Sequence, residues 1–166
     1  MDGFSFLIDE ATYYDAIIID LPDPKNVDIN KLYTREFYEL CHRHLRPYGV
    51  IVTQAGSPYY STRAFRCIDK TIKAAGFQTL PIHNQVMSLG EWGWIIGSKH
   101  LASSEMKNKL HNASLEGMET RWLNPEAMLL LTSFGKDFFE LDSVEINTTY
   151  NPVLYHYYGK GNWEIY

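Results

Sequence analysis

The stretch Tyr14-Asp15-Ala16-Ile17-Ile18-Ile19-Asp20-Leu21-Pro22-Asp23-Pro24 decides the fold class of this 166-residue chain. An apolar run of β-branched residues ends at Asp20, and a second carboxylate, Asp23, follows three residues later between two prolines. This pattern is typical of a buried parallel strand, and open α/β sheets bind ligands at the carboxyl ends of such strands. The stretch therefore predicts a strand over 14–20 with a functional site directly after it.

Strand and helix patterns alternate further along the chain. Apolar spacing predicts helices over 31–45 and 62–75, and apolar runs predict strands over 50–54, 77–86 and 92–98. Short loops between alternating elements predict a parallel sheet, closed by an antiparallel hairpin across 87–91. We expect an α/β, three-layer, Rossmann-like sheet that lacks its first strands, because ligand-binding domains of this class normally place several strands before the site.

The chain divides by composition near residue 99. We expect 1–99 to be the carboxyl-terminal half of a Rossmann-like catalytic domain, opening with a helical turn over 2–10. Residues 100–166 form a mixed helical and aromatic tail packed on the same domain. Within it, we expect 101–121 to be polar and irregular, a helix to begin at 124–126 and run through Leu131, and 144–166 to be aromatic and extended.

Bulk composition excludes several classes of protein. With 45% apolar residues the chain is globular, and a net charge of −5 without a long basic run does not suggest nucleic-acid binding. No apolar run is long enough to span a membrane. Cys41 and Cys67 are expected to be reduced, packed thiols of a cytoplasmic protein, and the histidines lack the spacing of metal ligands, so no metal is expected.

Two carboxylates at one site suit a cationic amine. One of them can accept the proton of an attacking ammonium, while the other holds the distal charge. The structural alternative is that both cap a turn or a helix. Gln54 ends the next strand, where it binds a ligand or satisfies loop backbone. Tyr60 is a pocket wall or a packed aromatic, and Glu91 is a third site carboxylate or a solvated turn residue.

These residues resemble the polyamine aminopropyltransferase (spermidine synthase) family. The family strand followed by D-x-x-D-P is similar to Ile17-Ile18-Ile19-Asp20-Leu21-Pro22-Asp23-Pro24. Further similar segments are Asp2-Gly3, Leu32-Tyr33-Thr34-Arg35-Glu36-Phe37-Tyr38, Leu45-Arg46-Pro47-Tyr48-Gly49-Val50 and Gly90-Glu91-Trp92-Gly93-Trp94. The resemblance covers 2–99, and its details are similar to a bacterial branch whose full-length members carry a membrane-embedded amino-terminal half.

The resemblance implies transfer of an aminopropyl group from decarboxylated S-adenosylmethionine to putrescine or a related amine. It assigns Asp20 as the catalytic base. It further assigns the substrate-binding residues Asp23, Gln54, Tyr60 and Glu91 and the cofactor-binding residues Asp2, Gly3 and Leu21. The family's glycine-rich cofactor loop precedes the D-G pair at which this chain begins. We therefore expect little or no activity from this chain alone, and a parent protein with a membrane anchor.

Two other functions remain open from the sequence. A methyltransferase fragment on the same fold needs no second carboxylate for a distal cation, so Asp23 separates it from an aminopropyltransferase. A non-catalytic domain would associate through the open edge of its first strand. Because such an edge also suits a catalytic fragment, we expect a homodimer.

Overall fold

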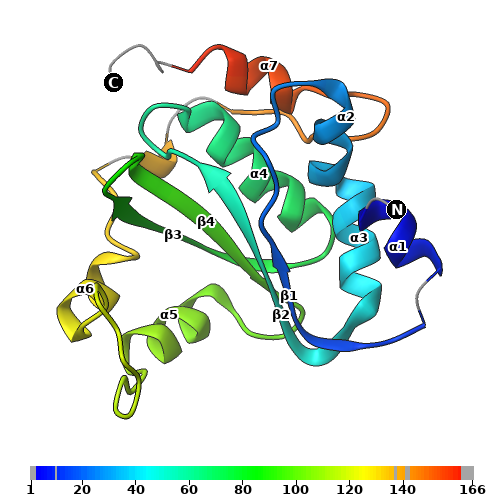
Figure 1. Cartoon of the computed structure of the whole chain (residues 1–166). Coiled ribbons are helices and arrows are strands. Elements are labelled where there is room, and N and C mark those ends of the chain that lie inside the picture. The colour runs from blue at the N-terminus through cyan, green and yellow to red at the C-terminus, as the bar shows by residue number, and fades with distance from the viewer. Residues whose placement is uncertain (1–2, 10, 137, 141–142, 162–166) are drawn as a thin grey trace.

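The computed structural model describes residues 3–9, 11–136, 138–140 and 143–161. They form a four-stranded sheet with helices packed mainly against one face (Figure 1). The strands are β1 (Tyr14–Ile19), β2 (Leu45–Gly56), β3 (Gln78–Val86) and β4 (Gly90–Ser98), and their order in the sheet is β1-β2-β4-β3.

Strand directions place the functional end of the sheet. β1 and β2 run parallel, with Ile18 opposite Val52 and Ile19 opposite Thr53. Their carboxyl ends therefore meet at one end of the sheet, where Asp20 follows β1 and Gln54 lies near the end of β2. β4 lies between β2 and β3 and is antiparallel to both, so the expected hairpin is confirmed, and β4 additionally pairs with β2.

The core lies between the sheet and the helices α1 (Gly3–Asp9), α3 (Arg35–His44) and α4 (Thr62–Ala74) (Figure 1). α4 buries one apolar face, with Phe65, Ile68 and Ile72 at 0–1% exposure. Gly76, at φ +95°, ends the helix in a backbone conformation that glycine tolerates best. A Cβ at Gly93 would collide with the ring of Phe65, so glycine lets β4 and α4 approach closely.

The predicted helix over 31–45 is divided in the structure. Its residues form the 3₁₀ turn η1 (Lys31–Tyr33) and α3, and a further short helix, α2 (Val27–Asn30), directly precedes them. Thr34 adopts an extended backbone, and its hydroxyl caps α3 by accepting a hydrogen bond from the N–H of Phe37 at 3.4 Å.

The prediction that the first strand is buried is wrong. β1 lies at the edge of the four-stranded sheet, and the Ile18 side chain is 77% exposed. A β-branched run with no polar alternation predicts burial on both faces, whereas here α1 and α3 cover one face and Ile18 lies on the other.

The carboxyl-terminal third is more helical than expected. It contains α5 (Ser103–His111), α6 (Pro125–Leu130), the 3₁₀ turn η2 (Phe138–Glu140) and α7 (Leu154–Gly159). The prediction of an irregular 101–121 is wrong for α5, which buries Met106 and whose Glu105 caps the N–H of Ala102 at 2.9 Å.

α7 lies beside α4 and near α2 (Figure 1), and its Leu154 and Tyr158 belong to the same core as the sheet. Among the described residues, no helix has the length and apolar character needed to cross a bilayer.

Candidate active site

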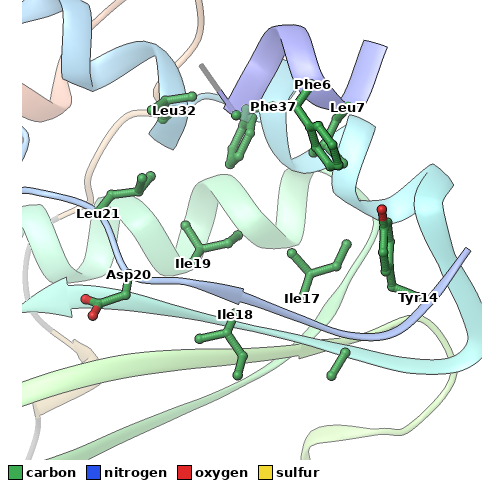
Figure 2. A pocket seen from close by; sticks show the side chains of 12 residues that line it. Phe6, Leu7, Tyr14, Ile17, Ile18, Ile19, Asp20, Leu21, Leu32 and Phe37 are labelled. Atoms are coloured by element: carbon green, nitrogen blue, oxygen red, sulfur yellow. The ribbon is translucent and has the colours of Figure 1, made fainter. Parts of the chain in front are cut away.

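An apolar hollow of about 420 Å³ lies between α1, β1 and α3; we call it the α1 hollow. Figure 2 shows aromatic and aliphatic side chains around it, with Asp20 at one end. Gly3, at the start of α1, belongs to its lining, and the space where a Cβ would stand is open. The full lining is Gly3, Phe6, Leu7, Tyr14, Ala16, Ile17, Ile18, Ile19, Asp20, Leu21, Leu32 and Phe37.

Two further hollows continue from Asp20 along the sheet edge. The tryptophan hollow, about 490 Å³, is lined by Ile18, Ile19, Asp20, Val52, Gln54, Ile82, Val86, Leu89, Trp92 and Trp94. The Asp23 hollow, about 460 Å³, is lined by Pro22, Asp23, Lys25, Asn26, Ile29, Gln54, Leu89 and Trp92. Asp20 lines the first two hollows, and Gln54, Leu89 and Trp92 line the last two. The three hollows therefore follow one another. Asp20 lies where the first two meet, and Asp23 lies beside Gln54, which the last two share.

Gln54 is the centre of the hydrogen bonding between these hollows. Its Nε2 donates to the carbonyl oxygen of Leu21 at 2.6 Å and approaches Asp23 Oδ1 at 3.4 Å. Its Oε1 accepts from Trp92 Nε1 at 2.9 Å. Because an indole N–H can only donate, Trp92 fixes the amide orientation and turns the Gln54 NH₂ toward the loop. Both sequence interpretations of Gln54 apply in part: it lines the site, and it satisfies loop backbone.

Tyr33, at the end of η1, donates its hydroxyl to the backbone of the same loop. Its hydroxyl lies 3.3 Å from the Pro22 carbonyl oxygen and 3.4 Å from that of Leu21. Burial raises the pKa of this hydroxyl above its usual range, and the nearby carboxylates Asp23 and Asp20 raise it further, against an opposing hydrogen bond from Gln54. Tyr33 therefore stays neutral near pH 7 and holds the backbone between the two aspartates.

Asp23 has three side-chain neighbours from different parts of the chain. Besides Gln54, the ammonium of Lys25 lies 3.6 Å from Oδ2, with the Lys25 side chain 71% exposed and that of Asp23 23% exposed. The third neighbour is Tyr158 of α7, whose hydroxyl lies near enough for the Asp23 carboxylate to raise its pKa. Burial and this carboxylate raise the Tyr158 pKa above its usual range, so the hydroxyl remains a neutral donor.

The remaining predicted residues lie in different places. Leu21 is in the lining of the α1 hollow together with Gly3, and Asp2 lies outside the described residues. Tyr60 follows β2, where its N–H donates to Ser57 Oγ at 3.2 Å, and it is absent from the linings of the three hollows. Glu91 bonds His83 Nδ1 at 2.8 Å.

Glu91 points away from the hollows because of strand alternation. Successive side chains on β4 face opposite sides of the sheet, and Trp92 faces the tryptophan hollow. Glu91 is opposite Gln85 in the hairpin, and its partner His83 also contacts the Ser133 carbonyl oxygen at 2.8 Å. The structure thus brings together Asp20, Asp23 and Gln54, and it places Glu91 beside the segment that follows α6.

Sequence reasoning did not assign Tyr33, Trp92 and Tyr158 to the site. Tyr33 and Trp92 both lie inside the sequence motifs that resemble the family. A motif does not reveal, however, that the Tyr33 hydroxyl contacts the backbone after Asp20 or that the Trp92 indole donates to Gln54. Tyr158 comes from a tail for which an extended backbone was expected, and no local signal relates it to Asp23. Among the described residues, no three His, Cys, Asp or Glu side chains gather in a way that would hold a metal ion.

Comparison with known proteins identifies the family. A family model described as spermine/spermidine synthase domain matches residues 1–109. The chain belongs to the spermine/spermidine synthase family. This confirms the resemblance drawn from Asp20-Leu21-Pro22-Asp23-Pro24 and its neighbouring motifs.

Relatives extend the family match over the tail. A polyamine aminopropyltransferase of Oceanobacillus iheyensis is 39% identical over 176 residues, covering 100% of this chain and 31% of the relative. Polyamine aminopropyltransferase 2 of Aquifex aeolicus is 37% identical over 162 residues, covering 96% of this chain and 31% of that relative. The chain thus spans about a third of the length of these curated relatives.

Solved structures of spermidine synthases share the fold. The enzyme from Thermotoga maritima superposes with a TM-score of 0.65 at 19% identity, covering 84% of this chain and 46% of that one. A spermidine synthase in complex with the transition-state analogue AdoDATO gives a TM-score of 0.64 at 21% identity, with the same coverage. At these identities the likeness establishes the fold, and it confirms the predicted α/β, methyltransferase-like class.

Proposed function

We propose that this chain forms the amine side and part of the nucleoside side of an aminopropyltransferase. The donor would be decarboxylated S-adenosylmethionine and the acceptor putrescine or a related diamine. One observation carries the proposal: Asp20 lines both the α1 hollow and the tryptophan hollow, and Asp23 lines the next hollow along the same edge. Family membership supports the same reaction.

The α1 hollow suits the nucleoside part of the donor. It is apolar, with Gly3 leaving space at its α1 end and Leu21 at its loop end. A flat, uncharged ring system loses little by leaving water for such a site, and its size lies within the range of small-molecule pockets. We assign Gly3 and Leu21 to this role, and Asp2 as the neighbouring residue that the sequence pattern implies.

The reaction is a displacement at the carbon next to the sulfonium sulfur. The amine nitrogen forms the new C–N bond while the C–S bond breaks, and its electron pair stays on sulfur as a neutral thioether. The attacking amine loses a proton, since an ammonium has no lone pair, and Asp20 accepts that proton. Asp23 holds the distal ammonium of the diamine, so the reacting nitrogen is positioned rather than free to diffuse.

The test uses the purified protein expressed from its complete reading frame. With decarboxylated S-adenosylmethionine and putrescine, mass spectrometry should detect an aminopropylated diamine; with S-adenosylmethionine, no methylated diamine should form. Asp23→Asn should raise the KM for putrescine by at least about 10-fold, because a hydrogen bond to a charged group contributes about 1.5–3 kcal/mol.

Two controls make this result specific. Asp28→Asn removes an exposed carboxylate of α2, close in sequence to Asp23, and should leave the KM unchanged. Propylamine has no distal ammonium, so its KM should not respond to Asp23→Asn. A methylated product, or the absence of aminopropyl transfer in the unmodified protein, would refute the proposed function.

A further inference from the structure

The Asp23 hollow contains a cation as well as a carboxylate. Its described lining residues include one acid, Asp23, and one base, Lys25, beside the polar, uncharged Asn26 and Gln54. The side chain of Asp23 is 23% exposed, whereas that of Lys25 is 71% exposed, so the cation lies on the solvent side of the carboxylate. An amine bound in this hollow therefore has Asp23 on its inner side and the Lys25 ammonium toward solvent.

The two carboxylate oxygens of Asp23 face different partners. Oδ1 lies 3.4 Å from Gln54 Nε2, and Oδ2 lies 3.6 Å from Lys25 Nζ. Gln54 is uncharged and leaves the negative charge of Asp23 in place, whereas the Lys25 ammonium offsets part of it. A single carboxylate that is already partly paired can hold one ammonium of an acceptor, and no second carboxylate is found among the described residues that line this hollow.

The backbone fixes where the Lys25 side chain begins. The Lys25 N–H donates to the Asp23 carbonyl oxygen at 2.7 Å, which closes a tight turn around the buried Pro24. Asn26 follows directly and caps α2, since its Oδ1 accepts from the Ile29 N–H at 2.9 Å. None of these bonds uses the Lys25 side chain, so a substitution there changes the charge of the hollow and keeps the fold of the loop.

We propose that Lys25 is a specificity-determining residue that restricts the Asp23 hollow to diamine acceptors and disfavours triamines. This inference rests on the proposed function. A diamine places its distal ammonium at Asp23 and ends there. Spermidine, which is putrescine with an aminopropyl arm, places a third ammonium beyond Asp23, where the Lys25 ammonium repels it. Because spermidine is also the product of transfer to putrescine, the same repulsion disfavours a second transfer to the product.

The experiment compares acceptor preference in the unmodified protein, Lys25→Met and Lys25→Glu, each expressed from its complete reading frame. The donor is decarboxylated S-adenosylmethionine, and kcat/KM is measured for putrescine and for spermidine. Removing the cation should raise the ratio of spermidine kcat/KM to putrescine kcat/KM about 3-fold. Reversing the charge should raise this ratio about 10-fold, because an attractive pair is gained where a repulsive one is lost. The donor KM should stay within about 2-fold in both variants.

Two controls make the change in preference specific. Lys107→Glu makes the same change of charge at an exposed lysine of α5 and should alter the ratio by less than about 2-fold. Because the Lys25 side chain is exposed, its effect on the ratio should shrink at high salt. Mass spectrometry of the putrescine reaction should also detect more doubly aminopropylated product with Lys25→Glu than with the unmodified protein.

The outcomes separate this role from the proposed function. An unchanged ratio in a Lys25→Glu protein that transfers aminopropyl groups to putrescine would overturn the role of Lys25 alone. An unmodified protein that uses spermidine as readily as putrescine would overturn it as well. If Lys25→Glu does not fold, the 3-fold change expected for Lys25→Met decides the question. Absence of transfer to either acceptor by the unmodified protein would overturn the proposed function and this role with it.

Discussion

Gln54 should contribute to stability as well as to the site, and Gln54→Leu tests this. The substitution removes donation to the Leu21 carbonyl oxygen at 2.6 Å and acceptance from Trp92 Nε1 at 2.9 Å. Each such hydrogen bond contributes about 1 kcal/mol net, so the free energy of unfolding should fall by about 2 kcal/mol. For a domain of this size that corresponds to a Tm lower by about 4–8 °C.

The assay is urea unfolding followed by tryptophan fluorescence and circular dichroism. Gln54→Glu provides a sharper comparison, because the new carboxylate still accepts from Trp92 but cannot donate to the Leu21 carbonyl oxygen. It also faces Asp23, so its destabilisation at neutral pH should equal or exceed that of the leucine variant. Gln85→Leu, at an exposed position of β3, is the control and should lie within about 0.5 kcal/mol of the unmodified protein. If both Gln54 variants also lay within that range, the network would not hold the loop.

Three other measurements follow from the structure. Lys25→Met should lower the putrescine KM about 2-fold at low salt, because the Lys25 ammonium then no longer competes with the amine for Asp23. The effect should fade at high salt, since the ion pair is exposed and screened. A KM that is unaffected at both salt concentrations would contradict this competition. Cys41 and Cys67 are buried free thiols, and burial raises the pKa of each to about 12, so a thiol reagent should label them only as fast as the protein unfolds; fast labelling of the folded protein would contradict their burial. Because the pKa of Tyr33 is raised in the folded protein, the tyrosine of the unfolded chain loses its proton first as pH rises. The free energy of unfolding should therefore decline above about pH 10, and it should decline less steeply in Tyr33→Phe. Equal slopes in the two proteins would show that Tyr33 does not cause this pH dependence.

Local patterns predicted the parts of the fold in which one face of an element decides its structure. The helix over 62–75 differs from α4 by one residue, because its apolar positions recur on one face and Gly76 ends it. The strands over 77–86 and 92–98 correspond closely to β3 and β4. The exposure of Ile18 on β1 was not predictable in this way, since it depends on which elements cover that face of the sheet and not on its own neighbours.

The site was predictable where strand order alone brings residues together. Asp20 and Gln54 follow paired positions on adjacent parallel strands, so their proximity follows from the fold class. Strand alternation, by contrast, turns Glu91 away from Trp92, and that depends on a register which the sequence does not reveal. The burial of Tyr158 in the core has no periodic signal either, because it depends on α7 packing against the distant α4 and on Asn147, which holds the start of α7 through the N–H of Leu154.

The most direct test of the account is the kinetics of Asp20→Asn in the protein expressed from its complete reading frame. The matched control is Asp15→Asn, near the other end of β1, which breaks an exposed ion pair with Arg46. Loss of a general base should lower kcat by about 10²–10⁴-fold with the putrescine KM little changed. The residual rate should rise about tenfold per pH unit, because bulk solvent must then deprotonate an amine whose pKa is near 10. An Asp20→Asn protein that keeps a kcat within a few-fold of the unmodified protein, like the Asp15→Asn control, would contradict the assignment of Asp20 as the base.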